Sequence, residues 1–358
     1  MKKQLFLVLL LTVLVGCNPS ENQKKMTENI DNNPLLVEST LPYGAPDFSK
    51  IKDEHYRPAL LKGMALQNER IAAIANSNEA PTFENTIIAL EKSGVELERA
   101  SAVFNALTEA HTNDTLKVLQ KELSPKFAEH ADGIHLNEKL FARIKALYDK
   151  RESLQLDPES LKLLENYYED FEVAGANLSA ADKETLKKYN SELASLETDF
   201  NQTLLEGSLA AAQTINGKKI AIVNTTQQPL LSELADRNQR KQLFEAAWNR
   251  TDGGAHNTND ILKRIALLRA KKAALLGFKN YAEWSLQRTM AKTPAAIAQF
   301  FKDLVPASVG KAKAEAKAKA DAAKEAIDNA TTNAEVEQAK TAGTASVASV
   351  TPKPVAKP

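Results

Sequence analysis

The stretch "LKKYNSELASLETDFNQTL", Leu186 to Leu204, decides the fold class of this chain. Its large apolar residues recur every three or four positions, which places them on one stripe of an α-helix. They are Leu186, Tyr189, Leu193, Leu196, Phe200 and Leu204. Ser179, with Asp182 three residues later, predicts a capped start, and Gly207 predicts the end of the helix. The stretch therefore predicts a long amphipathic helix.

The flanking sequence repeats this helical pattern from about residue 41 to residue 305. Asp157 before Pro158 predicts a capped helix start, and Thr293 before Pro294 predicts another. A further helix is predicted in "NDILKRIALLRAKKAALLGF", closed by Gly277. Its apolar stripe consists of Ile261, Ile265, Leu268, Ala273 and Leu275 or Leu276. The sequence thus predicts an all-α, mainly helical fold over residues 41–305.

Strand signal is confined to "QTINGKKIAIVN", residues 213–224. Asn216-Gly217 lies there between two β-prone runs and predicts a tight turn, so we expect one small β-hairpin. No repeat with a period of 20 to 50 residues is visible, which argues against a solenoid.

The composition changes near the C-terminus. No aromatic residue follows Phe301 and no leucine follows Leu304, so residues 306–358 cannot bury enough apolar surface for a packed fold. Residues 311–330 are rich in Ala, Lys and Glu, which predicts a solvated helix. The last stretch, "GTASVASVTPKPVAKP", is typical of a disordered end.

The N-terminus has the pattern of an export signal. "MKK" precedes an apolar run from Leu5 to Val15 that is too short to span a bilayer of ~30 Å. The run ends in "LVGC", which resembles the lipobox of bacterial lipoproteins, so residues 1–17 are predicted to be a signal peptide and Cys17 to carry the lipid. The alternative is an ordinary secretory signal with a chance cysteine. Residues 18–40, polar and rich in Asn, would form a flexible tether between the anchor and the domain. We expect an exported, membrane-anchored protein that faces the periplasm or the cell exterior.

The charges argue against a nucleic-acid partner. Acidic and basic residues number 46 each, so the whole chain has no net field to attract nucleic acid. Basic residues on the predicted helix 259–278 are expected to meet acidic partners on other helices. These residues are Arg264, Arg269, Lys271 and Lys272.

The five histidines give no metal-binding motif. They are His55, His111, His130, His135 and His256. In HExxH the two histidines lie four residues apart on one helical face, next to a glutamate. His130 and His135 are five residues apart, with Gly133 interrupting, and no Glu follows either of them. His55 and His256 stand alone and are expected to form local hydrogen bonds. GxSxG is absent, and Cys17 is the single cysteine, so the sequence predicts no catalytic and no metal-binding residue.

Five stretches nevertheless resemble one family. They are residues 33–65 ("NPLLVESTLPYGAPDFSKIKDEHYRPALLKGMA"), 80–94 ("APTFENTIIALEKSG"), 123–144, 163–205 and 268–294 ("LRAKKAALLGFKNYAEWSLQRTMAKTP"). In order and spacing they resemble the zinc metallopeptidases of the thimet oligopeptidase group, and most of all the bacterial peptidyl-dipeptidases, also called dipeptidyl carboxypeptidases. The resemblance fails after about Lys319, where "AKEAIDNATTNAEVEQAKTAG" weakly resembles Ala-rich repeats of Gram-positive surface proteins. The tail is thus expected to be unrelated low-complexity sequence; a fusion, a frameshift, a chimera and a lineage-specific tail all remain open.

The resemblance implies a helical clamshell with a channel for short peptides, of which this chain would be the N-terminal lobe. It also implies zinc, held by an HExxH helix and a further Glu in a catalytic lobe that does not occur in these 358 residues. We therefore expect a truncated lipoprotein form of a peptidyl-dipeptidase that is inactive as this chain. Because the family is enzymatic but the zinc-binding motif is absent here, the sequence leaves open whether the protein is an enzyme. Its partners would be short peptides and, through Cys17, a membrane. The alternative is a non-enzymatic, lipid-anchored helical lipoprotein that binds peptides or a protein.

Overall fold

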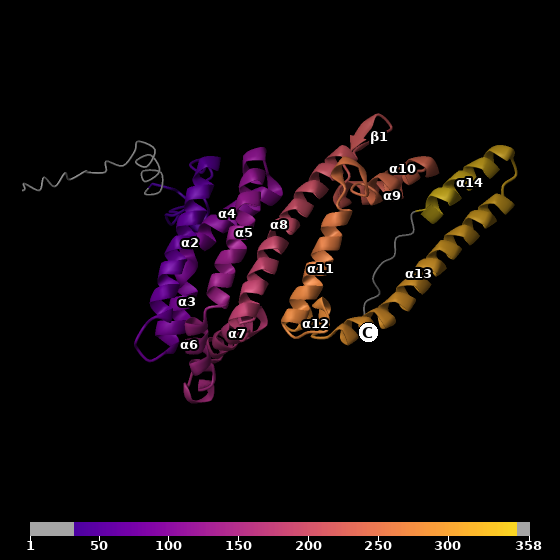
Figure 1. Cartoon of the computed structure of the whole chain (residues 1–358). Coiled ribbons are helices and arrows are strands. Elements are labelled where there is room, and N and C mark those ends of the chain that lie inside the picture. Colours follow the sequence, from indigo (N-terminus) through magenta and orange to yellow (C-terminus); the bar gives the residue numbers. More distant parts are fainter. Residues whose placement is uncertain (1–31, 349–358) are drawn as a thin grey trace, which may run out of the picture. The chain divides into compact units, whose positions relative to one another are not determined.

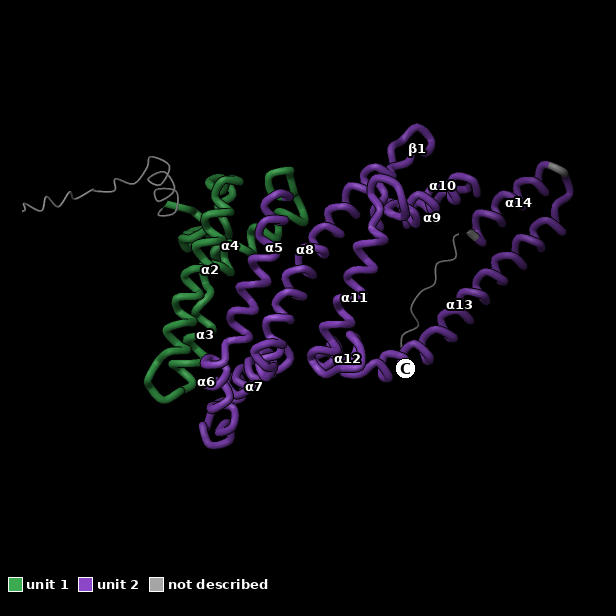
Figure 2. Tube along the Cα trace, in the orientation of Figure 1, with its two compact units in different colours: residues 1–116 green, residues 117–358 purple. Residues whose placement is uncertain are grey.

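A computed structural model describes residues 32–348, and these are mainly helical (Figure 1). The predicted all-α class is confirmed. The chain divides into two compact units, residues 1–116 and residues 117–358, which Figure 2 colours separately. This division falls inside the segment 41–305, which was predicted to be one lobe. The predicted limits at residues 17, 40 and 305 stay predictions.

Unit 1 is built on two packed helices. It contains a short 3₁₀ turn (Pro42–Gly44), α2 (Asp53–Ala75), a π-helical turn (Phe83–Ile88), α3 (Ala89–Glu91), a second 3₁₀ turn (Lys92–Gly94) and α4 (Val95–Ala110). α2 packs along α4, and the rings of Tyr56 and Phe104 meet in the core with centroids 5.6 Å apart. At Gly63 the helices come so close that a Cβ would lie 2.8 Å from the Cα of Leu97. Glycine is therefore required at this point by packing.

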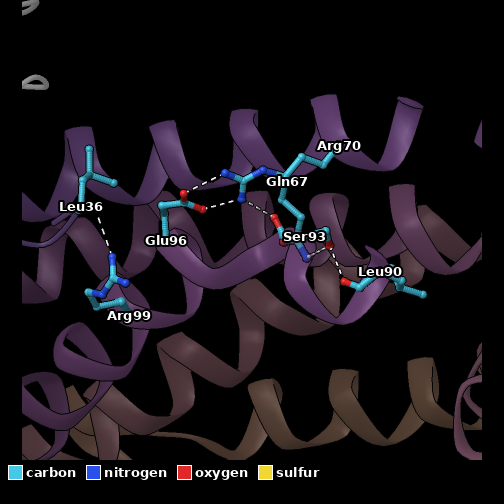
Figure 3. A network of polar contacts seen from close by, with 7 residues as sticks. All are labelled: Leu36, Gln67, Arg70, Leu90, Ser93, Glu96 and Arg99. Carbon is cyan, nitrogen blue, oxygen red and sulfur yellow. Dashed lines mark hydrogen bonds and ion pairs between the residues drawn. The ribbon is translucent and has the colours of Figure 1, made fainter. Parts of the chain in front are cut away.

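An ion pair with additional hydrogen bonds joins α2 to the start of α4 (Figure 3). The two terminal nitrogens of Arg70 donate to the two carboxylate oxygens of Glu96 at 2.6 and 2.8 Å. Arg70 Nη1 also donates to the carbonyl of Ser93 at 2.9 Å, and Gln67 Nε2 donates to Ser93 Oγ at 3.3 Å. The Arg70 guanidinium lowers the pKa of Glu96 to about 2. Such a bidentate pair is stronger than a single surface ion pair.

Replacing Glu96 with glutamine is expected to lower the free energy of unfolding at pH 7 by about 1 kcal/mol, since both partners stay partly exposed to solvent. The pKa of Glu96 falls on folding from its usual 4.5 to about 2, so the ion pair contributes fully above pH 4.5 and is lost as the pH falls towards 2. The difference between parent and Glu96→Gln in urea unfolding should shrink over that range. Glu98→Gln, at an exposed position on the same helix, serves as the control. A difference that stays constant with pH would contradict the assignment.

Unit 2 contains the longer helices. They are α5 (Asp114–His135, which starts just before the unit boundary), α6 (Glu138–Tyr148), α7 (Pro158–Ala174), α8 (Ala180–Ala210), α9 (Asn224–Glu233), α10 (Arg237–Trp248), α11 (Asn259–Leu275), α12 (Tyr281–Leu286), α13 (Pro294–Asp328) and α14 (Asn333–Ala348). Short 3₁₀ turns at Arg151–Ser153 and Gly254–His256 connect some of them. The predicted helix starts are confirmed, because Asp157, Ser179 and Thr293 each cap their helix with a side-chain oxygen.

The predicted stripes of α8 and α11 face each other. Leu193 packs with Ile265 and Leu268, and partly buried residues of both helices surround them. These partly buried residues are Tyr189, Leu196, Phe200 and Ile261. Gly277 follows α11 with a φ of 87°, as expected of a glycine that ends a helix.

The prediction that Gly207 ends the long helix was wrong. α8 continues to Ala210, and Gly207 lies buried within it. A Cβ at Gly207 would lie 2.7 Å from the carbonyl oxygen of Arg250 and 2.7 Å from a methyl of Thr251. The glycine is there because another segment crosses the helix closely, not because the helix stops.

The predicted hairpin is confirmed. β1 (Gln213–Ile215) and β2 (Lys218–Ile220) pair antiparallel, with Gln213 opposite Ile220. Asn216 and Gly217 both adopt positive φ, 51° and 76°, as expected of the two central residues of a type I′ turn.

The C-terminal helices pack mainly on each other. α13 has no buried residue among those described, which agrees with the predicted solvated helix over 311–330. α14 packs against α13 and runs beside it in Figure 1. Helix α14 extends to Ala348, so the expected disorder from Gly343 was wrong up to that residue. Packing against α13 supplies the ordering that the local sequence lacks. The rest of the expected disordered end, 349–358, lies outside the described residues.

The predicted export signal, with Cys17 and most of the tether 18–40, lies outside the described residues as well. Among residues 32–348, no helix combines the length and the apolar character needed to cross a bilayer.

Candidate ligand-binding pocket

A pocket of about 400 Å³ opens within unit 2 between α5, α7, α8, α11 and α12. Charged and amide side chains converge on it from several of these helices, and two aromatic rings of α12 complete the lining. The polar lining residues are Asp132, His135, Asp170, Asn190, Glu197, Arg269 and Lys272. Apolar area comes from small side chains such as Ala131 and Ala194. The pocket thus combines convergent polar groups with an apolar body, as ligand sites do.

A hydrogen-bonded relay joins a carboxylate to an ammonium across the pocket. Asn190 Nδ2 donates to Asp132 Oδ1 at 2.7 Å, and Lys272 Nζ donates to Asn190 Oδ1 at 2.7 Å. The three residues come from α5, α8 and α11. One amide group therefore orients a negative and a positive side chain at the same time.

The packing of α8 against α11 fixes the relay in place. Arg264 of α11 binds the carboxylate of Glu192 with two nitrogens, at 2.5 and 2.7 Å. Arg269 Nη2 donates to Glu197 Oε1 at 2.8 Å. The expected acidic partners are thus found on α8 for Arg264 and Arg269, whereas Lys272 contacts the amide of Asn190. The ion pairs and the apolar stripe set the register that brings Lys272 to Asn190.

Cations also lie over the two aromatic rings of α12. Lys272 Nζ lies 4.6 Å from the centroid of the Trp284 ring, and Arg269 lies 5.0 Å from that of Tyr281. Trp284 Nε1 donates to the carbonyl of Val173 at 3.0 Å, which holds the indole against α7. Both contacts are within the range of cation–π attraction.

Burial shifts the pKa values of the two ionisable groups in the relay in opposite directions. It raises the pKa of Asp132, while the hydrogen bond from Asn190 and the charge of Lys272 act against that rise. It lowers the pKa of Lys272, and the charge of Asp132 opposes this. The two groups thus support each other's ionised form in a poorly solvated place.

A larger hollow, of about 720 Å³, adjoins α7 and the segment after α11. Some of the charged residues that line it already form ion pairs. Arg288, for example, forms ion pairs with Asp170 and, at 3.6 Å, with Glu169. We therefore take the smaller pocket as the candidate site.

Of the histidines outside the pair His130 and His135, only His55 is seen in the local role that was expected. His55 Nδ1 accepts a hydrogen bond from the Lys52 amide at 3.1 Å and so caps α2, as expected of a local hydrogen bonder. His256 Nδ1 lies 3.8 Å from Oε2 of Glu206, a residue far away in the chain, so this contact is not the local hydrogen bond that was expected. His111 is the C-cap of α4.

His130 and His135 do not fit a zinc pair. His135 Nδ1 is engaged with the carbonyl of Ala131 at 2.9 Å, and its ring packs on Phe171 with centroids 5.1 Å apart. Burial lowers the pKa of His130. Gly133 does not interrupt α5, contrary to the sequence expectation. Across residues 32–348, no three His, Cys, Asp or Glu side chains are grouped so as to hold a metal ion. The described residues thus do not fit the zinc that the family resemblance implies.

The relay was not predictable from the sequence. Asp132, Asn190 and Lys272 lie far apart in the chain, and none belongs to a motif. A linear pattern could have placed each on a polar helix face, but the pairing depends on how three helices pack. The structure therefore brings together residues that the sequence did not single out as a site.

The comparisons with known proteins agree with one another on one family. Residues 230–338 match Peptidase family M3. The chain is 43% identical over 311 residues to a dipeptidyl carboxypeptidase of Escherichia coli, which covers 79% of the chain and 46% of that relative. It is 43% identical over 305 residues to a dipeptidyl carboxypeptidase of Salmonella typhimurium, which covers 77% of the chain and 45% of that relative. Identity to oligopeptidase A of Haemophilus influenzae is 25% over 304 residues, which covers 76% of the chain and 44% of that relative.

The match to the family extends further towards the C-terminus than the sequence predicted. It runs to residue 338, past Lys319, so the first part of the Ala-rich tail falls within the matched region. The chain spans about half the length of the curated relatives it matches. The chain therefore belongs to peptidase family M3, and it matches the N-terminal part of its longer relatives.

Proposed function

We propose that this chain is the N-terminal part of a peptidyl-dipeptidase, which hydrolyses short peptides and releases C-terminal dipeptides. The observation that carries this proposal is the 43% identity to two bacterial dipeptidyl carboxypeptidases over more than three quarters of the chain. The 358 residues contain no HExxH. On this proposal they supply helical structure and peptide contacts, and the metal ligands belong to a separate, catalytic part of the enzyme.

The DNA that follows the codon of Lys319 tests the proposal most directly. Translated in all three frames, it is expected to encode an HExxH followed by a further Glu. If none of the frames contains that pattern, a peptidase is excluded, and the alternative of a non-enzymatic, lipid-anchored binding protein takes its place.

The purified chain tests whether these residues act alone. Incubated with zinc and a tetrapeptide, it is expected to release no dipeptide, while the E. coli relative does so under the same conditions. Elemental analysis is expected to find no stoichiometric zinc. Dipeptide release together with bound zinc would contradict the proposed inactivity of this chain.

We further propose that the protein is exported and anchored through a lipid on Cys17. The support is the sequence itself, which places a lone cysteine two residues after a short apolar run. Two bound acyl chains anchor a protein stably, whereas one chain gives marginal binding.

Replacing Cys17 with serine is expected to abolish labelling by radioactive palmitate and to move the protein out of the membrane fraction. The label is lost because serine lacks the thiol that accepts the lipid. Ser20→Ala, three residues further on, should leave both labelling and fractionation unchanged. Labelling that persists in Cys17→Ser would exclude this residue as the lipid site.

A further inference from the structure

An exposed apolar stripe runs along the first half of α13. Phe301, Val305 and Val309 follow one another at intervals of four residues, which places them along one side of the helix. They are 53%, 48% and 45% exposed, and Phe300 beside them is 55% exposed. The rings of Phe300 and Phe301 meet edge to face, with centroids 5.6 Å apart. We call these four residues the α13 stripe.

The helices next to α13 in unit 2 leave the stripe uncovered. α14 runs beside the far part of α13 (Figure 1), and Gly343 approaches it at Ala323, more than ten residues beyond Val309. α12 also contacts α13, yet no α13 residue is buried among those described. Apolar side chains that gather on one face of a helix commonly mark a surface that another structure covers. We therefore expect a further neighbour of α13.

The family comparison indicates which neighbour this is. The stripe lies within residues 230–338, which match family M3, so it belongs to the part of the chain that the family shares. The match covers only 46% of the E. coli relative, and this chain corresponds to the N-terminal part of it. More than half of the relative therefore lies outside the match, and its sequence continues shortly after the region that contains α13. An uncovered helix face near this point fits a contact with the part that follows.

The size of the stripe argues against a second copy of this chain as the neighbour. Its four side chains, each about half exposed, offer roughly 350 Å² of surface. This is less than half of the ~800 Å² that each partner buries in a stable complex of separate chains. A segment of the same polypeptide needs less area, because the covalent link keeps it at a high effective concentration. The small area thus favours a neighbour within the same chain.

We propose that the α13 stripe is the surface on which the following, catalytic part of a family M3 peptidase docks through an apolar face of its own. This inference rests on the proposed function, because that function assigns the metal ligands to a separate part of the enzyme. It concerns a surface and not an activity, so it predicts burial of the stripe whether or not a peptide is cleaved.

Cysteine labelling measures this burial. In the full chain with Cys17→Ser, Val305→Cys gives the stripe the single thiol of the protein. The same variant is made in a joined chain, in which residues 1–338 continue into the part of the E. coli relative that follows its own match. A maleimide should modify position 305 at least roughly tenfold more slowly in the joined chain, because a buried thiol reacts only when the contact opens. Mass spectrometry resolves the labelled position.

Gln299→Cys is the matched control. Position 299 is exposed and lies two residues before Phe301, on the opposite side of α13. It should be modified at the same rate in the 358-residue chain and in the joined chain. Equal slowing at 299 and 305 would report a change that affects the whole helix, such as aggregation, and would contradict docking on the stripe.

Three results would overturn the inference. One is equally fast modification of position 305 in a joined chain that is folded by circular dichroism. Another is slow modification in the 358-residue chain together with a dimer that Phe301→Asp dissociates, which would make a second copy the occupant. The third is protection of the 358-residue chain by phosphatidylglycerol vesicles, which would make the stripe a lipid-binding face. If the joined chain does not fold, a cysteine at the aligned position of the complete E. coli relative decides, and fast labelling there refutes the docking surface.

Failure of the proposed function would give a different pattern. DNA without an HExxH after the codon of Lys319 would exclude a peptidase, but it would not change slow labelling in the joined chain. An HExxH in that DNA together with fast labelling would keep the proposed function and refute the docking surface. The two proposals can therefore be judged separately.

Discussion

Replacing Gly63 with alanine is expected to lower the free energy of unfolding by about 2 kcal/mol, although alanine is the better helix former by about 1 kcal/mol. Gly63 lies in the interior of α2, and the added Cβ would be 2.8 Å from Leu97 Cα and 2.9 Å from Leu97 N. These are backbone atoms of α4, which cannot rotate away as a flexible side chain could. The two helices would have to separate, and the core around Tyr56 and Phe104 would loosen with them. Urea unfolding followed by circular dichroism measures the loss.

Gly133→Ala is the matched control for this substitution. Gly133 lies in α5, and nothing would come within 4 Å of a Cβ there. This variant is expected to be more stable than the parent by about 0.5 kcal/mol through helix propensity alone. If the same substitution lowers the free energy of unfolding at Gly63 and raises it at Gly133, the close approach of α2 and α4 decides the effect at Gly63. A stabilised Gly63→Ala would mean that α2 and α4 can separate at little cost.

The sequence predicted those features of the fold that depend on neighbours in the chain. The caps Ser179, Asp157 and Thr293 each bind amides two or three residues away, so their residue type is sufficient evidence. The hairpin turn at Asn216-Gly217 needs positive φ at both positions, which these two residues adopt at low cost. Apolar stripes likewise depend on spacing alone, and the stripes of α8 and α11 were found in contact.

Features that depend on packing between distant segments were missed. At Gly207 a glycine looks like a helix end, but the crossing of Arg250 explains it, and no local signal separates the two cases. The helix at Gly343 forms against α13, whereas its own composition suggested disorder. The candidate pocket has the same origin, because its relay needs three helices in register. None of its three residues is unusual in its own stretch of sequence.

The register of α11 on α8 therefore controls both stability and the pocket. Leu268 is fully buried in the α8–α11 contact, at 0% exposure, and it precedes Arg269 and Lys272 on the same helix. Its side chain fills the space between Leu193 and Ile265 that sets this register. Shortening it would leave a cavity in the contact, which costs the lost transfer free energy and the cavity term together.

Leu268→Ala is expected to lower the free energy of unfolding by about 3 kcal/mol, measured by urea or thermal unfolding. Leu267→Ala, at the preceding position, removes the same atoms from a residue that is 47% exposed and should cost less than about 0.5 kcal/mol. The cavity also lets α11 shift against α8, so the hydrogen bond from Lys272 to Asn190 should weaken before the fold is lost. Trp284 fluorescence in folded Leu268→Ala would then be insensitive to replacing Lys272 with methionine, whereas in Leu267→Ala that replacement would still change the emission. Equal stability losses at positions 267 and 268 would contradict the α8–α11 contact from which both the fold of unit 2 and its pocket have been argued.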